Sequence, residues 1–415
     1  MSGATVMLSE IAEPKGLVGG PFGSDLTSSD YEADGVPVIR GSNMGSRMIE
    51  GEFAFVSQQK FEKSLCKNSA VAGDLIFTQR GTLGQVSQVP PSKYPIYVVS
   101  QSQMRLRVNP QQFDPTFVYY ACRNTPFTRQ IQDNAISTGV PHINLGILSR
   151  LSVPRRSLYE QRAIVKVLGA LDDKIAADFG TASKLRKLSN LEWTNALARA
   201  GSHLKRPTVG ELMAEGALAF SDGYRTRADQ LGSSGFRIVR VADIEQGFIS
   251  VDNPDFVRSE YLAQIGQKLG YPGDVLVTTK GTIGRVAVVL DVAEPIVYSP
   301  QICFFRPRAD SWLTSAYLAT WLRSEDFSRQ AAFRMHKTDM APYINLADIR
   351  SLEVPSIEDP ERDVLLRRLD LNEKLSQTTQ RESVHLAALR DTLLPALMSG
   401  KLRVKDAERV VEDVL

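Results

Sequence analysis

The stretch GDLIFTQRGTLGQV, residues 73–86, returns 200 positions later as GDVLVTTKGTIGRV, residues 273–286. Each copy has an apolar run, a polar and basic pair, a G-T-x-G turn and a second apolar run. This order predicts a β-hairpin-like unit, because the turn glycines adopt backbone dihedrals that other residues avoid. A chain that carries the unit twice is expected to perform one kind of task twice.

The repeat extends over most of each half of the chain. Further matched pairs are 35–44 with 235–244, 98–108 with 297–307, Phe127–Gln130 with Phe327–Gln330, and 140–154 with 341–355. The matches are collinear, and their period is far longer than that of a solenoid repeat, so they indicate two whole homologous domains. Short β-branched runs alternate with turns in both, with one helical stretch each, around Thr116–Gln132 and Leu313–Phe333. A mixed α/β globule is the expected fold of each domain.

Long helical periodicity follows each copy. In the first, Ser157 and Glu160 have the spacing of a capping box, and Ile164, Leu168, Leu171 and Ile175 continue at coiled-coil spacing. Gly180 is expected to bend or break this helix.

The second helix is predicted to start at Asp359-Pro360 and to stop at Gly400. Its apolar face comprises Leu365, Leu369, Leu375, Leu386, Leu389, Leu393 and Leu397.

The predicted fold class is α+β, with two homologous mixed α/β domains separated by two long antiparallel coiled-coil helices and related by a pseudo-twofold axis. Each helix alone would leave an apolar stripe in water, so the two are expected to pack on one another. The predicted boundaries are 1–156 for the first domain, 157–206 for the first helical spacer, 207–356 for the second domain, 357–404 for the second spacer and 405–415 for a tail.

Composition identifies no partner by itself. The formal charge is +2, from 49 basic and 47 acidic residues, so a nucleic-acid surface requires local clustering of charge. Three scattered cysteines and four histidines argue against a zinc site or a disulfide framework. No apolar segment has the length of a membrane span, and no signal peptide precedes the first domain, so a cytoplasmic location is expected.

The motifs resemble those of the specificity (S) subunit of Type I restriction–modification systems, over nearly the whole chain. They are the G-D-x-[IL]-x-T…G-T-[IL]-G unit, the I-N-L segments at 143–145 and 344–346, the E-Q-R-A-I helix start at 160–164, and LRDTLLPALMSGKLRV at 389–404. The second helix departs from the pattern, since Pro360-Glu361-Arg362 replaces E-Q-R.

The resemblance implies a non-catalytic subunit with two target-recognition domains, each of which recognises one half of a bipartite, asymmetric site on double-stranded DNA. It also implies helical spacers that dock two methyltransferase (M) subunits, for adenine-N6 methylation, and restriction (R) subunits in the same complex. S-adenosylmethionine would be bound by the methyltransferase and ATP with magnesium by the restriction subunit, and this chain would bind neither. In agreement, the sequence has no phosphate-binding P-loop and no N/D-P-P-x methylation motif. Helices of about 40 residues would span roughly 60 Å, which allows the half-sites to lie one to almost two turns of DNA apart.

Residues expected at the DNA interface are polar or basic and lie mostly where the two copies differ or beside the shared motifs. They are Arg40, Ser42, Asn43, Gln79, Arg80, Thr82, Gln101, Gln103, His142 and Asn144 in the first domain, and Tyr224, Arg225, Arg227, Arg240, Asp243, Lys280, Thr282, Gln301, His336, Lys337, Tyr343 and Asn345 in the second. The residues expected to contact the methyltransferase are Ile164, Leu168, Leu171, Leu389, Leu393 and Leu397. No residue is expected to be catalytic or to bind a metal.

Several alternatives stay open at this point. The G-T-x-G turns either hold a DNA phosphate or serve only the fold. Asp172 and Asp173 superficially resemble a nuclease cluster, but their heptad positions favour a solvated helix face. For the whole chain, the rivals are a scaffold that binds protein or glycan, and a nuclease or phosphotransferase that uses the G-T-x-G loops.

Overall fold

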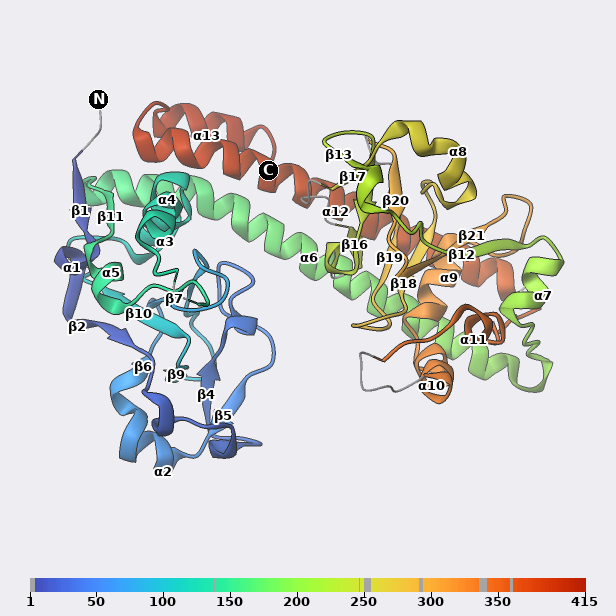
Figure 1. The fold of residues 1–415 in the computed structure, drawn as a ribbon, viewed down its shortest axis with the longest axis horizontal. Coiled ribbons are helices and arrows are strands. Elements are labelled where there is room, and N and C mark those ends of the chain that lie inside the picture. Colours follow the sequence, from blue (N-terminus) through green and yellow to red (C-terminus); the bar gives the residue numbers. More distant parts are fainter. Residues whose placement is uncertain are drawn as a thin grey trace. The chain divides into compact units, whose positions relative to one another are not determined.

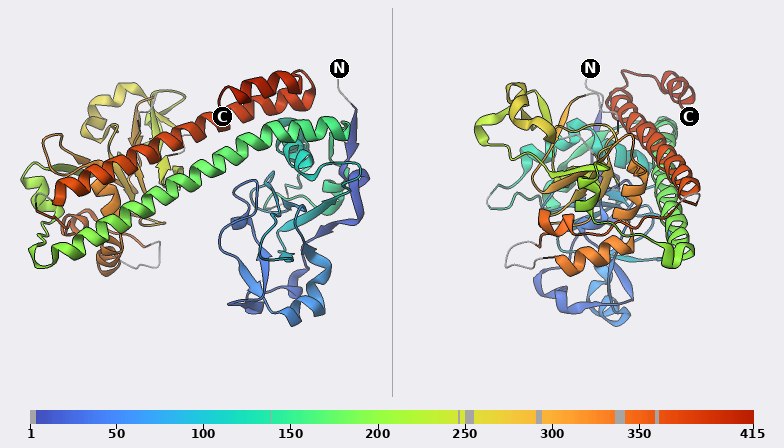
Figure 2. Two further views of the ribbon diagram at one scale, coloured as in Figure 1. Left: turned by 180° about the vertical axis from the view of Figure 1, so that it is seen from behind. Right: turned by 90° about the vertical axis from the view of Figure 1, so that its right-hand side faces the viewer.

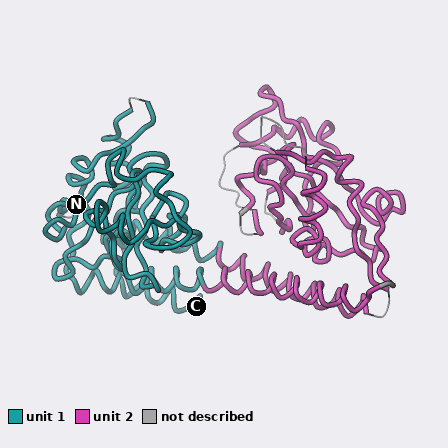
Figure 3. Tube along the Cα trace, turned by 90° about the horizontal axis from the view of Figure 1, so that it is seen from below, with its two compact units in different colours: residues 1–176, 384–415 teal, residues 177–383 magenta. Residues whose placement is uncertain are grey.

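The computed structural model describes residues 4–137, 139–245, 247–249, 255–290, 294–335, 342–358 and 361–415. The chain divides into two compact units (Figure 3), which are residues 1–176 with 384–415 and residues 177–383. Among the described residues, no helix combines the length and the apolar composition that crossing a membrane requires.

The first unit contains two sheets of four and five strands, with orders β2-β10-β7-β8 and β3-β5-β4-β9-β6, and a β1-β11 pair. Its strands are β1 (Thr5–Met7), β2 (Ala12–Gly19), β3 (Tyr31–Glu32), β4 (Val36–Ile39), β5 (Ala54–Val56), β6 (Ser69–Ala70), β7 (Leu75–Thr78), β8 (Val86–Gln88), β9 (Tyr97–Val99), β10 (Gln103–Val108) and β11 (Ser152–Pro154). Its shorter helices are α1 (Leu8–Ile11), α2 (Gln58–Lys60), α3 (Pro115–Arg123), α4 (Thr125–Asn134) and α5 (Leu145–Arg150).

The second unit repeats this topology. Its four-stranded sheets have the orders β12-β21-β18-β19 and β13-β17-β14-β20, beside a β15-β16 pair. The strands are β12 (Leu218–Asp222), β13 (Leu231–Gly232), β14 (Phe236–Val239), β15 (Ile244–Glu245), β16 (Phe248–Ile249), β17 (Phe256–Val257), β18 (Val275–Thr278), β19 (Val286–Val288), β20 (Ile296–Tyr298) and β21 (Ile302–Pro307). The helices are α7 (Val209–Ala214), α8 (Leu262–Ile265), α9 (Ser315–Leu322), α10 (Glu325–Arg334) and α11 (Leu346–Arg350).

The opening motif forms a β-hairpin in both units, as predicted. Strand β7 pairs antiparallel with β8, and β18 pairs in the same way with β19. The turn glycines of the first hairpin, Gly81 and Gly84, have φ of 106° and 91°, in the region that favours glycine. Parallel pairing occurs at equivalent places, between β4 and β9 and between β14 and β20, so both units are mixed.

The single helical stretch predicted in each copy is wrong, because the structure has two helices there (Figure 1). In the first unit, Asn124 is extended between α3 and α4, and Pro126 lacks the N–H that a continuous helix would use. In the second, the Ser324 side chain accepts a bond from the Phe327 N–H and starts α10 anew.

The two long helices are α6 (Leu158–Ala200) and α12 (Glu361–Ser399), and both are shared between the units. The helix does not break at Gly180, because α6 runs through it, and glycine costs a helix only about 1 kcal/mol. The predicted stop is confirmed, since α12 ends at Ser399 and Gly400 has φ of 74°. The predicted start at Asp359-Pro360 lies outside the described residues.

The long helices pack together antiparallel. In the first unit the early part of α6, with Leu168 and Leu171, shares a core with the late part of α12, with Leu393 and Leu397. In the second unit the late part of α6, with Trp193, shares a core with early α12 residues such as Leu369. Residues 404–412 form a further helix, α13 (Val404–Glu412), which lies against the first unit's core through Ala407 and Val411 (Figure 2).

A polar cluster joins the short elements of the first unit to both long helices. Arg390 of α12 contacts Asp172 of α6 at 2.6 Å, and the Tyr120 hydroxyl donates to the same carboxylate at 2.6 Å. Arg47 pairs with Asp173 at 2.6 Å. Burial, together with Asp172, raises the pKa of Tyr120, so this phenol stays a hydrogen-bond donor. The prediction of a solvated face at Asp172 is therefore wrong.

Candidate nucleic-acid interface

The hairpin turn and the I-N-L motif meet in both units. The Ile143 N–H donates to the Gln79 carbonyl at 3.0 Å, and the Ile344 N–H donates to the Thr279 carbonyl at 3.0 Å. Isolated β-bridges join Arg80 to His142 and Lys280 to Tyr343. The repeated motifs thus build one local frame that holds a basic residue at its exposed edge.

Most shared motif residues serve the fold. The aspartates of the repeated G-D pair are buried and contact arginines of the neighbouring strands, Asp74 with Arg107 at 2.8 Å and Asp274 with Arg306 at 2.6 Å. The Tyr298 hydroxyl also donates to Asp274, at 2.6 Å.

Six residues predicted at the DNA interface lie around one pocket of the second unit. This second-unit pocket has a volume of about 470 Å³. The predicted residues that line it are Tyr224, Arg225, Arg227, Arg240, Lys280 and Gln301. Thr226 and Ser299 complete the polar part of the lining.

A close backbone approach forms the wall of the second-unit pocket. The Tyr224 N–H donates to the Tyr298 carbonyl at 2.8 Å, directly after Gly223. A Cβ atom at Gly223 would lie 2.2 Å from the Ser299 carbonyl oxygen, so only glycine fits there. The Gln230 amide then donates to the Tyr224 hydroxyl at 2.9 Å and holds the ring.

The first unit has a pocket at the equivalent position, of about 500 Å³, called here the first-unit pocket. Its lining includes the predicted residues Arg40, Gln101 and Gln103. Gln101 donates to the carbonyl oxygens of Gly23 and Leu26, at 2.8 and 2.6 Å, and so fixes the loop that borders the pocket. Gly20 repeats the role of Gly223, because a Cβ atom there would lie 2.1 Å from the Ser100 carbonyl oxygen.

The two pockets differ in chemistry. The second-unit pocket has Arg225, Arg227, Arg240 and Lys280, whereas Arg40 is the one cationic residue in the first-unit lining. The first-unit lining otherwise has hydroxyl and amide groups, from Thr27, Ser28, Tyr31, Ser100, Gln101, Ser102 and Gln103.

Sequence reasoning missed some of these residues, including Thr27, Tyr31, Thr226 and Ser299. The loops that carry three of them differ in length, with 15 steps from Gly20 to Gly35 and 12 from Gly223 to Gly235, so position matching fails there. The sequence feature that could have located both loops is the glycine at the start of each, Gly20 and Gly223.

Other predicted residues lie outside both linings. Ser42, Arg80, Thr82 and Thr282 are exposed, while Gln79, His142 and Tyr343 are half-buried. Asn144 and Asn345 accept bonds from the N–H groups of Ile147 and Asp348, both at 2.8 Å, and so cap α5 and α11. The carboxylate of Asp243 accepts from the Arg240 N–H at 2.7 Å. His336 and Lys337 lie outside the described residues.

Asn43 needs a correction. It is 1% exposed and donates to the carbonyl oxygens of Glu50 and Glu52, both at 3.0 Å, so it stabilises its loop and offers DNA no surface.

The predicted methyltransferase contacts also need a correction. Ile164, Leu168, Leu171, Leu393 and Leu397 are buried in the core of the first unit, and Leu389 is packed against it. Coiled-coil spacing identified the seam between α6 and α12, because an intramolecular seam and a partner interface have the same apolar periodicity.

Among the described residues, no group of three or more His, Cys, Asp or Glu side chains has the arrangement of a metal site.

Comparison with known proteins agrees with the geometry. Residues 22–184 match the family model of the Type I restriction modification DNA specificity domain. The chain is 20% identical over 327 residues to the Type I restriction enzyme MjaVIII specificity subunit of Methanocaldococcus jannaschii, which covers 74% of this chain and 75% of that protein. It is 27% identical over 143 residues to the EcoBI specificity subunit of Escherichia coli, or 33% of this chain and 28% of that protein.

A crystal structure of the Type I restriction–modification S subunit from M. genitalium has the same fold, with a TM-score of 0.50, 17% identity and 95% of each chain covered. The duplicated fold and the paired long helices are thus shared with this S subunit. The chain is similar in sequence and in fold to the specificity subunits of Type I restriction–modification systems, and residues 22–184 carry the match to their DNA specificity domain.

Proposed function

We propose that this subunit directs its complex to a bipartite, asymmetric DNA site, and that each unit recognises one half. The observation that carries the proposal is the pair of pockets at equivalent positions with different linings, one with four cationic residues and one with a single arginine. Equivalent position implies the same task, and a different lining implies a different target sequence.

The domain boundaries predicted from the sequence form part of this proposal. Residues 1–156 and 207–356 would be the two recognition domains, with α6 and α12 as the spacers. Because both helices belong partly to each unit, a DNA spacer between the half-sites would follow from their length.

The long helices are proposed to dock methyltransferase subunits through residues that the fold leaves exposed. On α12, Val364, Leu371 and Leu375 follow one another at helical spacing and are 44%, 57% and 46% exposed. On α6, Leu188 and Leu191 are 44% and 62% exposed. The methyltransferase subunits would bind S-adenosylmethionine for adenine-N6 methylation. A restriction subunit would bind ATP with magnesium.

A domain exchange tests the bipartite model. Residues 207–356 are replaced by the corresponding domain of another family member, and the methylated sequences are determined by methylome sequencing beside the native system. One half of the methylated site is expected to change while the other half and its adenine stay the same. Changes in both halves would contradict independent recognition by the two units.

The rival scaffold that binds protein or glycan makes a different prediction. DNA binding through phosphates weakens steeply as salt rises, because bound counterions are released. Absence of salt-dependent DNA binding by the assembled complex would favour the scaffold.

A further inference from the structure

The cations of the second-unit pocket have little charge compensation. Arg225 and Arg227 are exposed, and neither forms an ion pair with a described residue. Lys280 lies 5.8 Å from the centre of the Tyr343 ring, a contact that leaves its charge available. Arg240 differs, since Asp255 accepts from it at 2.6 Å. Three positive charges without an ion-pair partner in the described part of the chain therefore surround the pocket.

Buried hydroxyl groups in the same pocket have no partner within the described part of the chain. Ser299 is 3% exposed, and its Oγ makes no hydrogen bond there. Thr226 is half-buried, and its covered Oγ1 also lacks a hydrogen-bond partner. Neighbouring atoms cover both oxygens, so the pocket wall holds two unsatisfied polar groups and the cations are the groups that a ligand can reach. Cationic side chains are among the groups that proteins use to hold DNA phosphates.

The first-unit pocket has a single cation, and none of its lining hydroxyl groups is buried without a partner among the described residues. Thr27 takes the place of Arg227 at the start of the equivalent turn, and Gln101 and Ser102 continue the uncharged lining. The counterpart of Ser299 is Ser100, whose hydroxyl is satisfied because it donates to Gln103 Oε1. Only Arg40 supplies a positive charge here.

We infer that the second-unit pocket binds phosphates of the DNA backbone through Arg225, Arg227 and Lys280. The first-unit pocket has no such phosphate cluster and contributes mainly uncharged contacts. The second unit thus supplies most of the ionic part of DNA affinity. This inference rests on the proposed function.

The test measures how DNA affinity depends on salt. The full chain is assembled with its methyltransferase and titrated with a duplex that carries the native methylated sequence, over a range of salt concentrations. Each lost phosphate contact reduces the slope of log K against log salt by about 0.9. Arg225→Gln with Arg227→Gln and Lys280→Gln is therefore expected to reduce it by about 2.7, and Arg40→Gln in the first unit by 0.9 or less.

A matched control removes the same charge from exposed positions of the second unit that do not line its pocket. Arg308→Gln with Arg350→Gln and Arg329→Gln is expected to leave the slope nearly unchanged. A triple pocket variant that binds the native sequence with the wild-type slope would overturn the inference and leave the bipartite model standing. Failure of the wild-type complex to prefer its methylated sequence over a scrambled duplex would instead overturn the proposed function.

Discussion

At the scale of single residues, side chains that are identical in the two copies stabilise the fold, and side chains that differ line the two pockets proposed for recognition. Asp74 and Asp274 occur in both copies and are buried in ion pairs. Thr27 and Arg227 occupy equivalent turn positions and differ in charge at the pocket edge. Within this duplicated chain, the shared residues and the differing residues therefore lie in different places, the former in the core and the latter at the pocket edge.

The three cysteines give a prediction about local burial. Cys66 is exposed, whereas Cys122 and Cys303 are buried. Burial raises the pKa of the Cys303 thiol from 9.0 to about 12, which lowers its thiolate population at neutral pH about a thousandfold, and burial raises the pKa of Cys122 as well. We expect one rapidly reacting thiol per native chain with a disulfide reagent at pH 8, and three after denaturation.

The Cys66→Ser variant is the control and should abolish the rapid phase. Two or more rapid thiols in the native protein would show that the cores around α3 and β21 open easily.

Some of these residue roles were predictable from the sequence. The turn glycines were, because only a positive φ explains glycine at those hairpin positions. Asn43 was not, since a polar side chain at a turn suits a loop contact and a DNA contact equally well. Ser299 was not, because neither its burial nor its missing partner leaves a trace in the local pattern.

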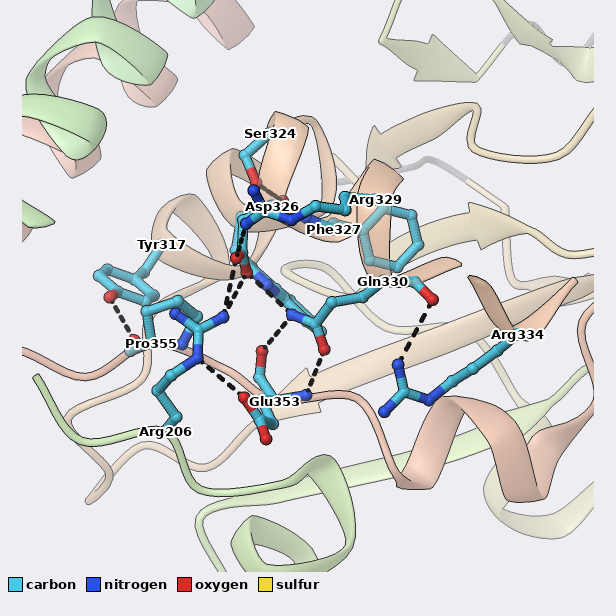
Figure 4. A network of polar contacts seen from close by, with 11 residues as sticks. Arg206, Tyr317, Ser324, Asp326, Phe327, Arg329, Gln330, Arg334, Glu353 and Pro355 are labelled. Carbon is cyan, nitrogen blue, oxygen red and sulfur yellow. Dashed lines mark hydrogen bonds and ion pairs between the residues drawn. The ribbon is translucent and has the colours of Figure 1, made fainter. Parts of the chain in front are cut away.

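At the scale of elements, the repeated F-[ST]-R-Q motif joins a helix to a strand-like segment. Gln330 of α10 donates to the Glu353 carbonyl and accepts from the Glu353 N–H, both at 2.9 Å (Figure 4). Gln130 of α4 makes the same pair of bonds with Ser152, at 3.0 and 2.9 Å. The glutamine is repeated because one amide satisfies both backbone groups of an extended residue.

Two arginines of the second unit are predicted to differ in their contribution to stability. Arg206 forms ion pairs with Asp326 at 2.8 Å and with Glu353 at 2.9 Å (Figure 4). Burial alone would lower the pKa of Arg206, but the two carboxylates have the larger effect and raise it. Burial, with Arg323 nearby, lowers the pKa of Arg186 to about 10. Arg206→Met should cost about 2 kcal/mol, because Glu353 loses its ion pair and Asp326 keeps only Arg329 and Gln330 as partners. Arg186→Met should be neutral or stabilising.

Urea unfolding followed by tryptophan fluorescence measures the difference in this unit alone, since Trp193, Trp312 and Trp321 all lie in residues 177–383. An equal loss of stability in both variants would show that the bond from Arg186 to the Ser376 hydroxyl, 3.1 Å long, outweighs the cost of burying the charge.

Elements were predictable where a local rule decides them. The hairpins and the stop at Gly400 follow from glycine chemistry and were found. The break between α3 and α4 and the continuity of α6 through Gly180 were missed, because in both places packing and capping compete with propensity.

At the scale of the whole molecule, α6 and α12 have two kinds of apolar surface. The buried kind holds each unit together, as Leu369 does in the second unit with 0% exposure. The exposed kind, with Leu371 and Leu375, covers no described part of the chain's core, and apolar side chains that recur along one helix face indicate a partner helix. The sequence predicted the two helices but placed the methyltransferase contacts on their buried apolar surface. Apolar periodicity does not distinguish a stripe that faces the core from one that faces outward.

Substitutions of neighbouring leucines on α12 test this division. Leu371→Asp with Leu375→Asp should change the stability of the second unit by about 1 kcal/mol or less, since both side chains are exposed. If the two leucines are buried on docking, at about 1.5 kcal/mol each, methyltransferase binding should weaken about a hundredfold or more. Leu369→Asp, two residues away, should instead unfold the second unit, which tryptophan fluorescence would detect. Size-exclusion chromatography with the methyltransferase distinguishes the outcomes, and an intact complex from the Leu371 and Leu375 variant would place the docking surface elsewhere on the helices.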